Sequence, residues 1–153
     1  MSVEPHRPAG YGPVSASVLA GVAYALAVFG VGFGLGAIRI LVLTPLLGSA
    51  IAVLLEAPFI LGASWWLSLK CTSQFHVMAL ASVRVLMGTV ALATLMLTEI
   101  GLSVTTFHRP PSEYLQSLMS LPGAIGLGGQ LAFASIPLLQ AYLGLHRKHT
   151  GRH

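Results

Sequence analysis

Apolar residues along this chain fall into four long runs, and short polar or proline-containing connections separate them. A bilayer core of about 30 Å needs about 20 apolar residues in each spanning helix. The runs therefore predict membrane helices over about 14–38, 46–69, 77–102 and 121–145. Together they occupy most of the chain and predict an all-α fold, a bundle of four transmembrane helices.

The segments between and beyond the runs are short. Residues 1–13 hold three prolines and two glycines and predict a disordered N-terminal tail. Thr44-Pro45 predicts a tight turn between the first two helices, and 113–119 predicts a short interfacial helix after a proline pair. Residues 146–153 form a basic C-terminal tail.

The first apolar run also has a competing interpretation as a secretory signal peptide. Ala25-Leu26-Ala27 has the small-residue pattern of a cleavage site. The apolar run continues well beyond it, however, and is longer than the apolar region of a signal peptide. We therefore expect the first helix to be part of the mature protein.

Composition supports a membrane protein and excludes some functions. Hydrophobic residues make up 55% of the chain and charged residues only 8%, with a mean hydropathy of +0.82. Soluble domains carry about 25% charged residues. The net charge of +4 lies mainly at helix ends and tails. A folded basic surface with interleaved aromatic residues is missing, which argues against a nucleic-acid partner.

The distribution of Lys and Arg predicts the orientation. With both termini in the cytoplasm, the cytoplasmic side gathers more basic residues than the opposite side, as membrane insertion favours. The cytoplasmic set would be Arg7, Lys70, Arg147, Lys148 and Arg152, against Arg39 and Arg109 outside. The expected topology is N-in, C-in.

Glycines within the runs predict close helix packing. Gly32 and Gly36 have the GxxxG spacing that lets membrane helices approach each other, and Gly88 lies on a small-residue face of the third run. The glycine-rich stretch 30–36 also resembles a nucleotide-binding loop. It follows no strand and lies inside a span, so packing is the preferred interpretation.

Four charged residues lie within or at the edge of the spans: Arg39, Glu56, Arg84 and Glu99. An unpaired charge at the bilayer centre costs about 2.5–3.5 kcal/mol, so depth decides the pairing. A rise of about 1.5 Å per residue matches Arg39 with Glu99 near the outer boundary. It leaves Glu56 with Arg84 as a strained pair. Two positive and two negative groups favour charges that fix helix register, and Glu56 is the candidate for a titrating group.

Other site chemistry is sparse. Cys71 is the single cysteine, so no intramolecular disulfide or CxxC pair is possible. His76 and His108 lie at span ends, where they would not hold an intramembrane haem. His146, His149 and His153 have the spacing of ligands on one helical face, but a basic tail near anionic lipid is preferred. We expect no cofactor, no metal and no catalytic residues, and the absence of enzyme motifs favours a non-enzymatic protein.

Through several short motifs, residues 25–140 resemble a family of small uncharacterised four-helix bacterial inner-membrane proteins. The family pattern combines Gly-x-x-Arg, Pro-x-x-Gly and Glu-x-Pro, matched here by Gly36, Arg39, Pro45, Gly48, Glu56 and Pro58. One departure is Leu46, where the family often has arginine. The resemblance implies a multi-pass protein of the bacterial inner membrane and assigns no activity.

Two functional hypotheses follow. The first is a structural or accessory membrane protein, which associates with itself or joins a larger membrane complex through its glycine-rich faces. The second is a small proton- or solute-conducting protein in which Glu56 titrates and Arg39 or Arg84 is the counter-charge. The bilayer is the one partner that both hypotheses require.

Overall fold

The computed structural model describes residues 12–107 and 110–150, and every regular element in those ranges is helical. The helices are α1 (Pro13–Ile38), the π-helix η1 (Arg39–Leu43), α2 (Thr44–Leu47), α3 (Ser49–Gln74), α4 (Ala81–Phe107), α5 (Pro111–Leu118) and α6 (Leu121–Thr150). Four helical spans are long and apolar enough to cross a membrane. The prediction of an all-α, multi-pass membrane fold is confirmed, and the side on which the termini lie stays a prediction.

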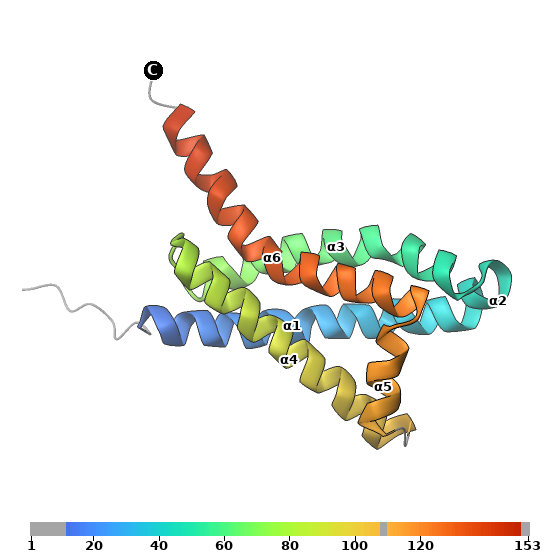
Figure 1. Cartoon of the computed structure of the whole chain (residues 1–153). Coiled ribbons are helices and arrows are strands. Elements are labelled where there is room, and N and C mark those ends of the chain that lie inside the picture. Colours follow the sequence, from blue (N-terminus) through green and yellow to red (C-terminus); the bar gives the residue numbers. More distant parts are fainter. Residues whose placement is uncertain (1–11, 108–109, 151–153) are drawn as a thin grey trace, which may run out of the picture.

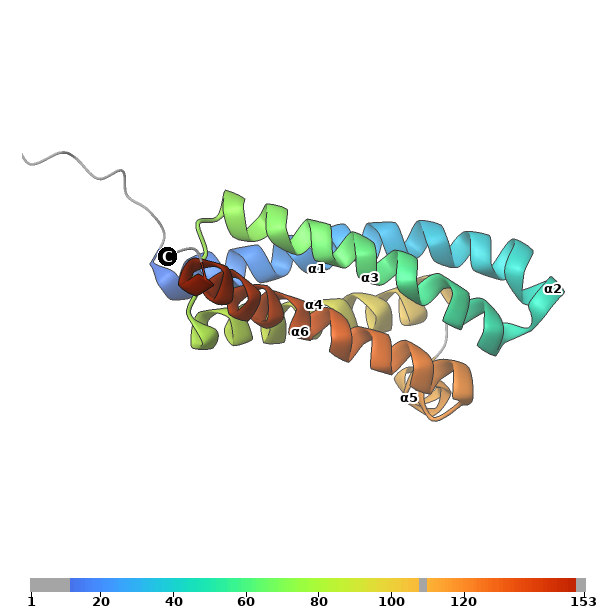
Figure 2. The ribbon, with the colours of Figure 1, turned by 90° about the horizontal axis from the view of Figure 1, so that it is seen from above.

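The four long helices form a ring. α1 packs against α3 and α4, and α6 packs against the same two helices from the opposite side. The α2 hairpin joins α1 to α3 at one end, and α5 joins α4 to α6 (Figure 1). Viewed from above, α1 runs toward that hairpin and α3 runs back from it, whereas α6 lies over α4 (Figure 2).

The first turn of the chain lies later than the sequence predicts. The backbone stays helical through Leu47 and reverses at Gly48, whose φ of 81° is readily adopted by glycine. Within η1, the Thr44 N–H donates to the Arg39 carbonyl, five residues back. Pro45 has no N–H to donate, and a widened turn accommodates it without ending the helix. The turn expected at Thr44-Pro45 is therefore absent there.

The end of the ring near the start of α1 is tightly packed. We call it the packed half and define it by the buried residues Ala20, Tyr24, Met87, Ala91 and Phe133. A Cβ on Gly21 would lie 2.7 Å from the Met87 carbonyl oxygen, and one on Gly88 would collide with the Ala134 carbonyl oxygen. Backbones of α1, α4 and α6 thus approach closely, as small residues allow in membranes.

A proline in α6 is compensated by a tyrosine of α1. Pro137 removes the N–H that would bond the Phe133 carbonyl in a regular helix. The Tyr24 hydroxyl donates to that same oxygen at 3.1 Å, and the two rings stack with centroids 4.4 Å apart. The C-terminal part of α6 leans away from the other helices (Figure 1).

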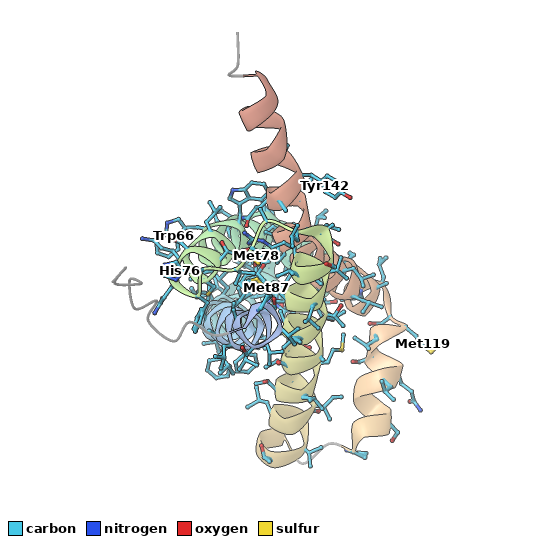
Figure 3. The ribbon with its side chains drawn as sticks, turned by 90° about the vertical axis from the view of Figure 1, so that its left-hand side faces the viewer. Trp66, His76, Met78, Met87, Met119 and Tyr142 are labelled. Atoms are coloured by element: carbon cyan, nitrogen blue, oxygen red, sulfur yellow. The ribbon has the colours of Figure 1, made fainter. Side chains whose placement is uncertain are left out.

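Arg84 lies in the packed half, at the connection between α3 and α4. Its Nε donates to the Met78 carbonyl and its Nη2 to the Val77 carbonyl, both at 3.1 Å. These carbonyls follow His76, which has a φ of 52°. Figure 3 looks down the bundle from this end and labels His76, Met78 and Met87. The expected, strained pairing of Arg84 with Glu56 is wrong, because Arg84 instead donates to the carbonyls of this connection.

The outer surface of the ring is apolar, as expected for contact with lipid. Leu46, Leu97 and Phe59 are among the large apolar side chains that are exposed and lie outside the cavity lining. The expected short helix is α5, which begins two residues earlier than predicted. Residues 1–11 of the expected N-terminal tail lie outside the described residues. The predicted C-terminal tail is helical as far as Thr150, and 151–153 also lie outside.

Candidate intramembrane cavity

A cavity of about 590 Å³ lies inside the ring, toward the α2 hairpin. Residues of α1, η1, α3, α4 and α6 line it, and most of them are aliphatic or aromatic. Small-molecule sites typically have volumes of about 300–1,000 Å³ and mostly apolar walls with a few polar groups. The cavity therefore has the size and lining of a ligand site.

One wall of the cavity carries the ion pair between Arg39 and Glu56. Arg39 Nε lies 2.8 Å from Glu56 Oε2, and the two side chains are 31% and 15% exposed. The Nε–H is not directed along this line, so the contact is an ion pair without a well-aligned hydrogen bond. The predicted partnership of Arg39 with Glu99 is wrong.

The position of the turn explains this pairing. Arg39 precedes Gly48 by nine residues, and Glu56 follows it by eight. At 1.5 Å per residue, each lies about 12–14 Å from the hairpin turn. A turn at Thr44-Pro45 would have left Arg39 near the boundary and Glu56 much deeper.

The facing wall carries a second polar pair. Gln130 Nε2 on α6 donates to Glu99 Oε2 on α4 at 2.8 Å. Gln130 Oε1 is buried and has no hydrogen-bond partner among the described residues. A buried acceptor without a donor costs about 1–3 kcal/mol, so this oxygen favours a donor from a water or a ligand.

The four polar residues lie a similar number of residues from the ends of their helices on the side of the α2 hairpin. Glu99 precedes the end of α4 by eight residues, and Gln130 follows the start of α6 by nine. Arg39 and Glu56 have the same spacing from their own turn. We call Arg39, Glu56, Glu99 and Gln130 the polar layer of the cavity.

The cavity is closed toward the packed half. Val28, Leu95 and Phe133 line its inner end and are themselves buried. Phe133 stacks on Tyr24, which is fully buried below it. Among the described residues, buried side chains therefore close the inner end of the cavity.

The glycines expected at helix contacts divide between the two halves. Gly88 lies at the close approach of α4 to α6, whereas Gly32 and Gly36 line the cavity. A Cβ on Gly32 would make ordinary contact with Ile60, and one on Gly36 would lie 3.8 Å from Arg39 Nη2. At these two positions, the absence of a side chain leaves space inside the bundle.

Two polar residues of the cavity were not selected from the sequence as site residues. Gln130 is an amide within an apolar run and shares a helical face with Gly126 and Phe133. An isolated amide within an apolar run was the feature of the sequence that could have identified Gln130 as a site residue. Ser64 also lines the cavity, but its hydroxyl donates to Ile60 within α3, a bond that serine often makes in membrane helices.

Two carboxylates, one guanidinium and one side-chain amide line the cavity. Among the described residues, no three His, Cys, Asp or Glu side chains are grouped as a metal site would require. The side chains of the C-terminal histidines lie outside those residues. Proton exchange at a carboxylate and binding of a polar group are the chemistry that the polar layer supports.

Comparisons of the chain with protein-family models, curated proteins and solved structures found no match.

Proposed function

We propose that this multi-pass membrane protein conducts or carries a proton or a small solute through its central cavity. Glu56 is the titrating group and Arg39 is its counter-charge. The observation that carries the proposal is the position of this ion pair on the wall of a 590 Å³ cavity. A pair that only fixed helix register would be expected in a dry contact between helices.

The geometry also limits the mechanism. The cavity is closed at its inner end by Phe133 and Tyr24. A solute that crosses must therefore wait for movement of these rings, which makes a carrier-like cycle more suitable than an open channel. The partial exposure of Glu56 allows it to exchange a proton with water from the cavity.

Flux into liposomes tests this function. The wild-type protein and Glu56→Gln would be reconstituted with a pH gradient and an internal pH dye. We expect wild-type flux above that of empty liposomes and at least a tenfold loss in Glu56→Gln. Glu113→Gln, outside the four spans, is the matched control and should retain flux. Flux that persists in Glu56→Gln would exclude Glu56 as the titrating group.

A second candidate function is that of a structural or accessory protein that associates with itself. Its support is a set of glycines that face no other part of the chain within the described residues. A Cβ at Gly30, Gly34, Gly128 or Gly144 would meet nothing within 4 Å. Such positions are suited to close contact with another membrane helix. Chemical cross-linking in native membranes tests it, and recovery of monomer alone would count against it.

The proposed location is the bacterial inner membrane, with both termini in the cytoplasm. Its support is the excess of Lys and Arg on that side and the resemblance carried by Gly36, Arg39, Glu56 and Pro58. A reporter fused to either terminus, active only in the cytoplasm, would test the orientation.

A further inference from the structure

We propose that the cavity holds one acyl chain of a bilayer phospholipid, which enters from the side, between α1 and α4, while its head group stays at the membrane surface. The inference concerns what fills the cavity at rest, and it goes beyond the proposed conduction. It rests on where the cavity opens, what lines it and how large it is.

The cavity opens along α1 and η1. The lining residues of α3, α4 and α6 are buried or half-buried. Four lining residues are instead exposed, and all of them belong to α1 and η1: Phe33, Ala37, Ile40 and Leu41. Leu41 is 77% and Phe33 58% exposed. Side chains that line a cavity and are also largely exposed mark its rim, so the rim follows this segment.

The contacts of α1 place the opening on the side of α4. Toward α3, a Cβ on Gly32 would already touch Ile60, and Arg39 pairs with Glu56. These contacts hold α1 and η1 against α3 along the cavity. Toward α4 the two helices separate, because α4 leans away from α1 beyond the packed half (Figure 1). The opening therefore faces sideways, between two helices.

The opening lies at the depth of the membrane spans. Its rim belongs to the span Pro13–Leu47, and the facing part of α4 belongs to the span Ala81–Thr105. At 1.5 Å per residue, the helix from Phe33 to Leu41 is about 12 Å long. The molecules around a span at this depth are the hydrocarbon chains of lipids, whereas head groups and water lie at the surface. An acyl chain is thus the group that meets the opening.

The walls and the volume of the cavity suit a hydrocarbon chain. Most of the lining is aliphatic or aromatic, and the volume of about 590 Å³ equals the share of about 20 water molecules in the liquid. Most of those waters would lack polar partners, and an empty cavity would cost its walls their dispersion contacts. A chain from the adjoining bilayer fills the space and leaves the contact of Arg39 with Glu56 in place.

Photo-cross-linking in nanodiscs tests the proposal on the unmodified protein. The full-length chain would be reconstituted in phosphatidylcholine with a small fraction of phosphatidylcholine that carries a diazirine in the middle of one acyl chain. Mass spectrometry would map the adducts. We expect Ile60 and Ile125, which line the cavity, to be labelled within fivefold of Leu97, which is 71% exposed outside the lining. Weaker labelling of both lining residues would overturn the proposal.

Two variants locate the chain. Gly126→Phe places a ring in the cavity, since Gly126 lines it and a Cβ there meets nothing within 4 Å. Labelling of Ile60 should fall at least tenfold, and labelling of Leu97 should stay the same. Gly128→Phe, on the same helix with equal space but outside the lining, should be labelled as the wild type is. Size-exclusion profiles verify that both variants are folded, and equal labelling of Ile60 in all three proteins would overturn the proposal.

Native mass spectrometry of the purified protein identifies the occupant. We expect one retained phospholipid in the wild type and in Gly128→Phe, and a lipid-bound fraction at least tenfold smaller in Gly126→Phe. A retained molecule without phosphate, such as an isoprenoid, would overturn the assignment to a phospholipid. Neither measurement uses a gradient. Retained lipid without flux would therefore reject the proposed conduction alone, whereas flux with neither retained lipid nor labelled lining residues would reject this inference alone.

Discussion

The two halves of the ring use small residues and polar groups in opposite ways. In the packed half, Gly21 and Gly88 bring backbones together, and the Tyr24 hydroxyl and the Arg84 guanidinium satisfy backbone carbonyls. In the other half, which contains the cavity and which we call the cavity half, Gly32 and Gly36 leave space. There the side chains of the polar layer pair with each other. The comparison teaches that one composition, glycine with isolated polar groups, builds either a closed core or a chamber.

The direction of α4 accounts for much of this difference. α4 packs against α1 in the packed half and then leans away from it toward α5 (Figure 1). A Cβ on Gly21 would lie 2.7 Å from the Met87 carbonyl oxygen, so the backbones of α1 and α4 are close at this crossing. The Tyr24 hydroxyl and the Arg84 guanidinium therefore bond backbone carbonyls within reach, whereas the polar layer faces the cavity.

The largest expected effect is that of Gly88→Ala. The added Cβ would collide with the Ala134 carbonyl oxygen, a backbone atom that cannot move aside without shifting α6. We expect a loss of about 3 kcal/mol of stability, the upper end of what overpacking usually costs, measured by denaturant titration in detergent micelles. Gly101→Ala, on the same helix with nothing within 4 Å, should change stability by less than about 0.5 kcal/mol. Similar stability of the two variants would contradict the close packing.

An intermediate effect is expected for Tyr24→Phe. The ring stack with Phe133 is kept, but the carbonyl freed by Pro137 loses its donor. Leaving a buried carbonyl unsatisfied costs about 1–3 kcal/mol, which the same titration would measure. Tyr142→Phe is the control, since Tyr142 is exposed on the outer part of α6, as Figure 3 shows. A loss no larger than in the control would show that water replaces the hydroxyl.

The smallest effect is expected from the ion pair of the cavity. A double-mutant cycle with Arg39→Met and Glu56→Met should give a coupling energy of about 1 kcal/mol, since both side chains are partly exposed and their contact is not well aligned. A coupling of several kcal/mol would indicate a dry, buried pair. That result would remove the contrast between the two halves and weaken the proposed function.

The number of spans and the four intramembrane charges could be predicted from sequence, because hydropathy and the cost of charge in lipid depend on residue type alone. The pairing of the charges could not. It depended on the location of the turn, and Pro45 suggested an earlier turn than Gly48 provides. The depth argument matched Arg39 with Glu99, and both residues line the cavity, but Arg39 pairs with Glu56. The outward lean of α4 is a tertiary feature that residue spacing does not reveal. Gln130 was visible as an isolated amide, and the acceptor it leaves unpaired was not.

The π-turn at η1 has a consequence for variation in length. A π-turn holds one residue more than an α-turn, so it records an insertion that the helix absorbed without breaking. Deleting Ile40 would restore α-helical winding, with four residues closing the turn that five close now. The helix before the deletion would keep nearly its direction and its distance from the Gly48 hairpin, so the contact of Arg39 with Glu56 should persist. The π-turn therefore marks a position where this helix tolerates a change of one residue in length.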